Sequence, residues 1–534
     1  MAKPTTSAPS SRNVLAPRIE LVVGVVLTVW CLALHFVYLF HAGPLWRDEC
    51  GTIAFASMSF GEMWSNLQYD NFPPFFEWIA HVWGIIFSPS DFSYRILGLV
   101  VAIATLAIIW FSAGVLGARV PLLALALYAL NPLALRVGDS MRPYGLGFAL
   151  IVLTVGFIWK FTQTRNRKWF VAASVAATLA VQSLYQNAFF VAAAIGAATI
   201  ICVRRKDWKC IGMCFCIGLI ALLFLLPHVP NIQKGDAWRE IARVPVSQQL
   251  LTDAVNELLK AAGSFMQPIY LIVLIATIGA GIFTAVKSRQ PNVIYAIAFL
   301  ILAPILQIVF LTKVGLPPRS WYFLNLLAPM IICADVIWSS LKPVVRIGCT
   351  AVAALIAVLT ATAVWSGSHL RQTNIDLIAQ KLKNEKKAED FVLVAPWFNG
   401  VSLCRYYPQT NFTTLPPMEE IRIHRYDLMK RAMQSPDPVG PLESQIVATL
   451  RGGHKLWLVG SLKFPKQGET VAQYPPYYTG IGMNDAAYYF SWSGRLGKLV
   501  QEHAKVGDVV TPAAPGPVNS VENLNLIAIS GWHD

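Results

Sequence analysis

The stretch IELVVGVVLTVWCLALHFVYLFHAGPLWRDEC (residues 19–50) decides the fold class, because a long apolar run is followed at once by charged side chains. About 23 of its residues form one apolar run, and roughly 20 are enough to span a bilayer as a helix. No small-residue cleavage site follows, so the run predicts an uncleaved membrane helix rather than a removed signal peptide. Arg47, Asp48 and Glu49 would then stand in water beside the membrane.

The composition extends this interpretation to the whole chain. Its 534 residues are 55% hydrophobic and 13% charged, whereas soluble proteins carry about 25% charged residues. A polytopic membrane protein is therefore indicated and a soluble one excluded. The net charge of +14 is attributed to basic cytoplasmic loops, so no nucleic-acid partner is expected. The cysteines show neither a CxxC zinc spacing nor a disulfide framework.

Runs of roughly 17–25 apolar residues predict about eleven membrane helices. They lie near residues 19–41, 95–116, 119–136, 143–161, 169–186, 187–203, 209–228, 264–286, 291–311, 320–340 and 346–366. Basic residues gather in alternate loops, which the positive-inside rule places in the cytoplasm together with the N-terminal tail, residues 1–18. These loops carry Lys3, Arg12, Arg18, Arg119, Arg165, Arg167, Lys168, Arg204, Arg205, Lys206, Lys209, Lys287, Arg289, Lys342 and Arg346.

Two apolar segments are too short or too amphipathic to cross. PPFFEWIAHVWGIIF (residues 73–87) would reach about 22 Å as a helix, short of the ~30 Å core. We interpret it as an interfacial helix within an external loop, residues 42–94, because a span there would invert every later loop. A second external segment, 229–263, carries leucines at helical spacing near residues 250–259 and also predicts an interfacial helix.

The composition changes after residue 366. EDFVLVAPW (389–397) and HKLWLVGSL (454–462) are typical of buried strands, and RYDLMKRAMQ (425–434) and ESQIVATLRGG (443–453) of helices. Their alternation predicts an α/β domain over residues 367–534, which an odd number of spans places outside the cytoplasm. The domain has no GxGxxG or P-loop motif, so it is interpreted as a lid or packing domain without catalysis of its own.

Three external segments carry residues suited to chemistry. Asp48 and Glu49 follow the first helix, and either act on a substrate or serve the start of the next helix. Asp70 lies in the same loop and could join them around a divalent cation such as Mg²⁺ or Mn²⁺, although no metal site is predicted.

The second and third segments are basic. NPLALRVGDSMRPYGLGF (131–148) holds Arg136, Asp139 and Arg142, and TKVGLPPRSWYFLNLLAP (312–329) holds Lys313 and Arg319. Both are external in this topology, so the positive-inside rule does not explain them. Guanidinium groups suit phosphate; snorkelling to the headgroups is the alternative. Trp321 and Tyr322 are typical of an interfacial belt, and His228 of a structural histidine.

These segments resemble the membrane-embedded GT-C glycosyltransferases, in particular the group of protein O-mannosyltransferases and lipid A aminoarabinose transferases. The resemblance covers about the first 340 residues. It lies in WRDE (46–49), YDNFPPFFEWIAHVW (69–83), NPLALRVGDSMRPYGL (131–146) and RSWYFLNLLAP (319–329), in that order.

The resemblance implies roles for individual residues. Asp48 would be the catalytic carboxylate, supported by Glu49. Arg142 and Arg319, together with Lys313, would bind the donor phosphate, and Tyr144 would pack beside them. Asp70, His81 and Asp139 are further substrate-binding candidates. The family's histidine before the two prolines is Phe72 here, and Asp139 stands three residues before Arg142, farther than the usual acid.

The function implied is that of an inverting hexosyl or pentosyl transferase in a bacterial plasma membrane. It would move a sugar from a polyprenyl-phosphate donor to a lipid, glycan or protein acceptor on the outer side. A flippase of lipid-linked sugars, which would show inverted repeats and midplane charges, and a non-catalytic envelope scaffold are the alternatives.

Overall fold

The computed structural model describes residues 12–466 and 468–534, and the chain divides into two compact units. Unit 1 contains the described residues up to Leu39 together with Arg95–Pro227 and Val246–Ser368. Unit 2 contains Phe40–Tyr94, His228–Pro245 and His369–Asp534. Residues 1–11 of the expected cytoplasmic tail, Lys3 among them, lie outside the described residues.

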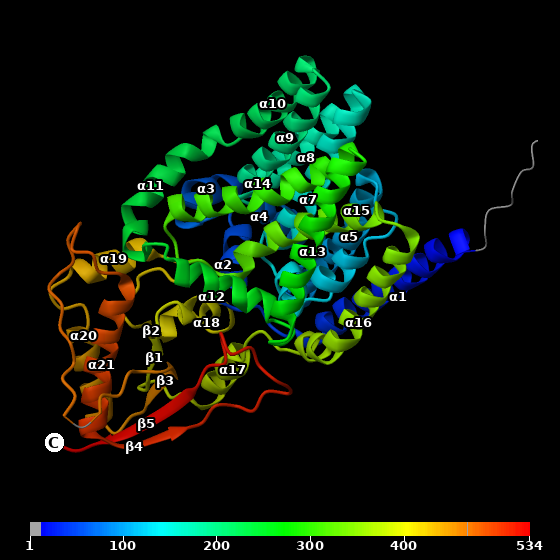
Figure 1. Ribbon diagram of the computed structural model, residues 1–534. Helices are drawn as coiled ribbons and strands as arrows, with labels where there is room; N and C mark the ends of the chain where they lie inside the picture. The colour runs from blue at the N-terminus through cyan, green and yellow to red at the C-terminus, as the bar shows by residue number, and fades with distance from the viewer. Residues whose placement is uncertain (1–11, 467) are drawn as a thin grey trace, which may run out of the picture. The chain divides into compact units, whose positions relative to one another are not determined.

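Unit 1 is a helical bundle (Figure 1). In the described part of the chain, nine helical segments are long and apolar enough to cross a membrane, which confirms the predicted polytopic helical class. The bundle comprises α1 (Arg12–His41), α5 (Asp91–Leu116), η2 (Ala124–Ala129), α6 (Pro132–Gly138), α7 (Tyr144–Thr164), α8 (Arg167–Ser183), α9 (Asn187–Arg204), α10 (Trp208–Leu223), η3 (Leu226–His228), α12 (Gln248–Leu259), α13 (Met266–Lys287), α14 (Pro291–Val314), η5 (Ser320–Phe323), α15 (Leu324–Ser339) and α16 (Pro343–Ser368).

One of the eleven expected spans differs from the prediction. The run at 169–186 does form one helix, α8, of 17 residues. The run at 119–136 is wrong as a continuous helix, because it is broken into the π-helix η2 and the short α6. Pro132 starts α6 and disfavours helical backbone at Asn131. The Asn131 side chain instead accepts hydrogen bonds from Leu133 N at 2.9 Å and Ala134 N at 3.2 Å, which caps the new helix.

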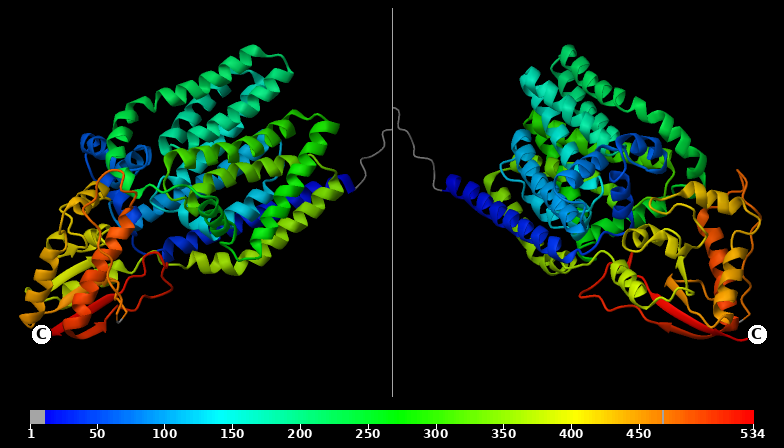
Figure 2. Two further views of the ribbon diagram at one scale, coloured as in Figure 1. Left: turned by 60° about the vertical axis from the view of Figure 1, so that its left-hand side comes forward. Right: turned by 180° about the vertical axis from the view of Figure 1, so that it is seen from behind.

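Two side-chain contacts join the first and last helices of the bundle. Helices α1 and α16 run alongside each other (Figures 1 and 2). Glu20 of α1 pairs with Arg346 of α16, both buried, and Trp30 stacks on Trp365 with ring centroids 6.1 Å apart. The two helices, more than 300 residues apart in sequence, are thereby fixed in register.

Unit 2 combines short helices with a mixed sheet. Its helices are α2 (Arg47–Ala56), α3 (Phe60–Asn66), η1 (Leu67–Tyr69), α4 (Phe75–Ile86), α11 (Val229–Arg239), η4 (Glu240–Ala242), α17 (Ile375–Glu385), α18 (Asn399–Tyr406), η6 (Gln409–Asn411), α19 (Tyr426–Gln434), α20 (Gly440–Arg451) and α21 (Asp485–His503). The short apolar helix expected at 73–87 is confirmed as α4, and the amphipathic helix expected near 250–259 as α12 of unit 1.

The sheet of unit 2 has the strand order β2-β1-β3-β5-β4. The strands are β1 (Phe391–Ala395), β2 (Thr413–Thr414), β3 (Leu456–Gly460), β4 (Ala504–Val509) and β5 (Leu526–Trp532). β1 is parallel to β2 and β3, and β5 is antiparallel to β3 and β4. Every residue of β1 and β3 is buried, as parallel strands require. This confirms the two predicted strands; β2, β4 and β5 were not predicted.

Unit 2 ties its three chain segments together by direct contacts. Trp238 of α11 donates its indole N–H to Gln68 O at 3.1 Å and stacks on Tyr426 of α19 with centroids 5.4 Å apart. Gln372 N donates to Ala42 O at 2.8 Å. The segments Phe40–Tyr94 and His228–Pro245, which connect helices of unit 1, therefore fold together with His369–Asp534 as one body.

Candidate functional site

The acidic motif forms the first turn of α2. Trp46 is the extended N-cap residue, and the Glu49 carboxylate accepts a hydrogen bond from Trp46 N at 3.2 Å. Glu49 has no exposed surface. Carboxylates in this turn also interact favourably with the helix dipole. The structural alternative raised by the sequence, an acid that serves a helix start, therefore holds for Glu49.

Asp48 is placed differently from its neighbour. Its side chain is 26% exposed, and the side chains of Arg47 and His424 face its Oδ1 atom. Arg47 Nε lies 3.4 Å away and His424 Nε2 lies 3.8 Å away. The guanidinium of Arg47 rests over the Phe398 ring, 4.4 Å from its centroid, which fixes its direction. Asp48 is thus an accessible carboxylate in a defined electrostatic setting.

A buried carboxylate from the far end of the chain supports the same turn. Glu522, with no exposed surface, accepts a hydrogen bond from Arg47 N at 2.8 Å through Oε2 and one from Ser402 Oγ through Oε1. Burial raises the pKa of Glu522 to about 7, although both hydrogen bonds and the Arg47 charge act to lower it. Sequence reasoning missed Glu522, because a glutamate between two unpredicted strands carries no local signal.

Helix α18 holds the residues just before the acidic turn. Tyr406 Oη donates to Asp91 Oδ2 at 2.6 Å and accepts from Leu45 N at 2.8 Å. Arg405 Nη2 lies 2.6 Å from Asp91 Oδ1. The turn that leads into Asp48 is therefore clamped by side chains of the C-terminal part of unit 2.

Asp70 and His81 lie in the same unit but serve other contacts. Asp70 is 9% exposed, its Oδ1 accepts from Asn71 N at 2.6 Å, and its carbonyl accepts from Arg239 at 3.2 Å. His81 Nδ1 donates to Ala56 O at 2.7 Å, which joins α4 to the end of α2. In the part of the chain that the structure describes, no three His, Cys, Asp or Glu residues are grouped to hold a metal.

The basic candidates lie in unit 1, on elements that contact one another. Helix α6, which carries Arg136 in its last turn, contacts η5. Arg319 is the N-cap residue of η5 and is exposed. Lys313 is exposed in the last turn of α14, which ends at Gly315 with φ of +69°, a conformation that favours glycine. Two basic segments far apart in sequence thus share one region of unit 1.

Arg142 and Tyr144 open α7 beside this region. Arg142 is half-buried, and Tyr144, the first residue of α7, is 6% exposed. The first turn of α7 approaches the end of α6 closely: a Cβ atom on Gly145 would lie 2.1 Å from Gly138 O, so only glycine fits there. This packing fixes the backbone that presents Arg142.

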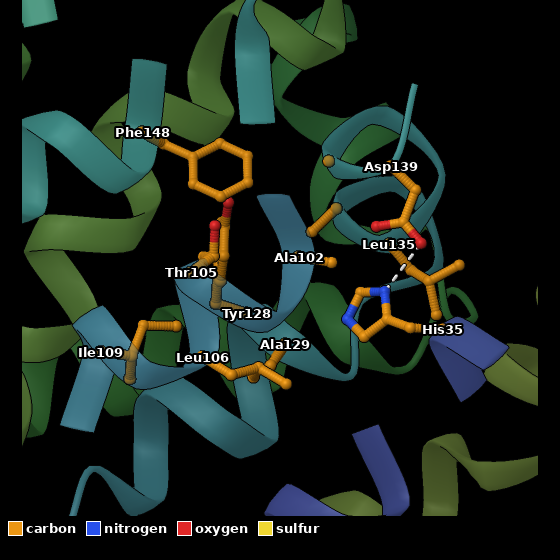
Figure 3. A pocket seen from close by; sticks show the side chains of 12 residues that line it. His35, Ala102, Thr105, Leu106, Ile109, Tyr128, Ala129, Leu135, Asp139 and Phe148 are labelled. Carbon is orange, nitrogen blue, oxygen red and sulfur yellow. Dashed lines mark hydrogen bonds and ion pairs between the residues drawn. The ribbon is translucent and has the colours of Figure 1, made fainter. Parts of the chain in front are cut away.

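Asp139 is engaged inside the bundle. Its Oδ2 atom lies 2.8 Å from Nδ1 of His35 on α1, and both side chains are buried. Figure 3 shows the pair at the edge of a cavity of about 20 Å³ that Tyr128 and Phe148 also line. Such a cavity has room for about one water molecule. Asp139 therefore joins α6 to α1 in this structure.

Comparisons with known proteins agree with the sequence motifs. The family model for dolichyl-phosphate-mannose-protein mannosyltransferase matches residues 71–230. The structure is similar to ArnT from Cupriavidus metallidurans bound to undecaprenyl phosphate, with a TM-score of 0.52 and 14% identity over 82% of this chain and 92% of that one. The apo form of the same ArnT gives a TM-score of 0.51 at 15% identity over the same shares of both chains.

A third solved structure has the same fold. The oligosaccharyltransferase of Archaeoglobus fulgidus, in complex with Zn and sulfate, gives a TM-score of 0.50 at 12% identity, over 82% of this chain and 67% of that one. A search of curated proteins finds no match. The chain therefore has the fold of the GT-C membrane glycosyltransferases, and the resemblance drawn from its motifs is confirmed.

Proposed function

We propose that this protein is an inverting glycosyltransferase that moves a hexose or pentose from a polyprenyl-phosphate donor to an acceptor at the outer face of a bacterial plasma membrane. The mannosyltransferase family description and the undecaprenyl phosphate bound by ArnT support a lipid-phosphate donor. The acceptor is a hydroxyl or phosphate oxygen of a lipid, glycan or protein.

The placement of Asp48 is the single observation that carries this proposal. Of the two motif acids, Glu49 is buried and bound to the helix N-terminus, whereas Asp48 is part-exposed. A general base must reach the proton that it abstracts, and Asp48 is the acid that meets this requirement. Glu49 would act by holding the turn that carries Asp48.

The reaction would be a single displacement at the anomeric carbon of the sugar. Asp48 takes the acceptor proton while the acceptor oxygen attacks the face opposite the phosphate. The bond between the anomeric carbon and the phosphate oxygen breaks, and polyprenyl phosphate leaves with that electron pair. Arg142 and Arg319, with Lys313, compensate the negative charge that grows on the phosphate.

Substitution of Asp48 tests the mechanism. Polyprenyl-phosphate mannose and polyprenyl-phosphate aminoarabinose, radiolabelled in the sugar, serve as donor probes with membrane extract as acceptor. Asp48→Asn should lower transfer from the donor that the wild type uses by roughly 10²- to 10⁴-fold. Asp508→Asn, an exposed aspartate of β4 in the same unit, is the matched control and should transfer normally. Retained transfer by Asp48→Asn would remove this mechanism.

The alternatives give different outcomes when the protein is reconstituted in lipid vesicles. A flippase would move a fluorescent donor lipid between leaflets with no sugar transferred, and a scaffold would do neither. Either result for the wild type would replace the proposal.

The proposed sidedness has its own test. A cysteine introduced at Glu502, exposed on α21, should react with a membrane-impermeant maleimide in intact spheroplasts. A cysteine at Lys206, exposed between α9 and α10, should react only after lysis. The reverse pattern would place the proposed site in the cytoplasm.

A further inference from the structure

Backbone hydrogen bonds fix the segment that carries Glu522, between β4 and β5. Glu522 N donates to Asn519 O at 3.1 Å, and Asn519 N donates to Arg371 O at 2.8 Å. Leu524 N donates to the Asn374 side chain at 2.9 Å. These bonds fix the turn on both sides of Glu522, so its carboxylate reaches α2 from a rigid support.

A buried carboxylate here needs a reason beyond stability. Removing a carboxylate from water costs several kcal/mol, and an apolar side chain in such a place is often equally or more stable. Buried acids with a strongly shifted pKa gather at functional sites. Glu522 accepts the backbone N–H of Arg47, one of the N–H groups that a helix start leaves without an intrahelical partner. The next residue is Asp48.

We propose that Glu522 is a positioning residue, whose hydrogen bonds to Arg47 N and Ser402 hold the first turn of α2 and thereby fix the carboxylate of Asp48. This inference rests on the proposed function, in which Asp48 is the base. It gives the C-terminal α/β part of the chain a share in the reaction, in place of the lid or packing role expected from sequence.

The electrostatic surroundings make the role dependent on pH. Arg47 and Asp48 of α2 act on Glu522 directly. The Cys50 thiol of the same helix interacts electrostatically with Glu522 and also with Glu49, Arg405 of α18 and Asp91 at the start of α5. His424, in the loop before α19, faces Asp48. With the pKa of Glu522 raised to about 7 by burial, its charge appears as the pH rises through neutrality. A charged Glu522 binds Arg47 N more strongly and makes the neighbouring Asp48 a stronger base.

The test is the pH profile of Glu522→Gln, an isosteric change that keeps a hydrogen-bond acceptor but cannot ionise. Transfer is measured from pH 5.5 to 8.5 with the labelled polyprenyl-phosphate sugar that the wild type uses. The wild type should show a rise in kcat centred near pH 7. Glu522→Gln should lack that rise, with kcat about 3- to 10-fold below wild type at pH 8, near-equal kcat at pH 6 and an unchanged KM for the donor.

Two further variants keep the test decisive. Glu502→Gln makes the same chemical change at an exposed site of α21 and should keep the wild-type profile. Ser402→Ala removes one hydrogen bond that lowers the pKa of Glu522, so its rise in kcat should move to higher pH. If Glu522→Gln does not fold, the shift in the pH profile of Ser402→Ala serves as the test.

The outcomes separate this inference from the proposed function. Wild-type profiles for both Glu522→Gln and Ser402→Ala, with Asp48→Asn inactive, overturn the positioning role and leave the glycosyltransferase mechanism intact. Transfer by Asp48→Asn overturns the mechanism itself, and the positioning role with it.

Discussion

Asp48 and Asp139 are both acids of the sequence motifs, yet their surroundings in the structure are opposite. Asp48 lies at a helix start, 26% exposed, with Arg47 and His424 at 3.4 and 3.8 Å. Asp139 lies at the end of α6, buried, with His35 at 2.8 Å. A motif places an acid near a boundary, but burial and its partner decide whether it can meet a substrate. The comparison makes Asp48 a candidate for chemistry and Asp139 one for holding helices together.

Substituting each acid separately tests whether Asp48 serves activity and Asp139 serves stability. Asp48→Asn should lower transfer by roughly 10²- to 10⁴-fold with little change in the thermal unfolding temperature, since the side chain is part-exposed. Asp139→Ala should lower the free energy of unfolding by about 1–3 kcal/mol, because it leaves the buried His35 without this partner. Transfer assays and melting in detergent measure the two effects. A stability loss at Asp48, or lost activity at full stability at Asp139, would reverse the assignment.

Glu522 extends the comparison to an acid that is both buried and close to Asp48. Burial raises its pKa from 4.5 to about 7, so the folded protein keeps a proton that the unfolded chain releases between these values. The stability from burying the neutral acid is full below pH 4.5 and is lost as the pH rises to 7.

Above pH 7 the buried charge costs roughly 3 kcal/mol, and Glu522→Gln should unfold at a higher temperature than wild type there. Below pH 4.5 the two should match. Calorimetry at several pH values checks this result. A variant less stable than wild type at pH 8 would show that the charge stabilises the fold.

Arg142 tests the basic counterpart of Asp48. Arg142→Lys keeps the charge but loses the planar pair of donors that binds phosphate oxygens side by side. We expect the KM for the lipid donor to rise about 10- to 100-fold, that is by 1.4–2.8 kcal/mol, and the unfolding temperature to change little. Lys168→Arg, at an exposed position on α8, is the reverse control and should leave KM unchanged. An unchanged KM for Arg142→Lys would favour a snorkelling arginine instead of a phosphate ligand.

His424 should give the smallest effect. Its contact with Asp48 is 3.8 Å long and both side chains are about one-quarter exposed, a setting in which ion pairs contribute about 0.2–1 kcal/mol. His424→Gln should therefore lower kcat by less than about fivefold. A loss of kcat as large as that of Asp48→Asn would show that His424 takes part in the reaction directly.

Local pattern was sufficient for much of the fold. The apolar runs predicted the bundle, and the short PPFFEWIAHVWGIIF segment predicted α4, because the length of an apolar run decides whether its helix can span a bilayer. The break at Asn131–Pro132 was missed, since the apolar composition continues through it while proline geometry and the Asn131 cap end one helix and start the next. Strands β4 and β5 were missed because β4 is largely exposed and β5 is only partly buried.

Hydropathy and charge, which are properties of short segments, were enough to predict a helical membrane protein with acids and arginines in separate loops. Which of the two adjacent acids is accessible depends on the fold, since Glu49 is buried against the start of α2 and Asp48 is part-exposed beside Arg47 and His424. The fold also brought Glu522 to the turn of Asp48. Residues so far apart meet because α18 packs on α2 and Glu522 bonds to both helices through Ser402 and Arg47 N. No local pattern encodes such a contact.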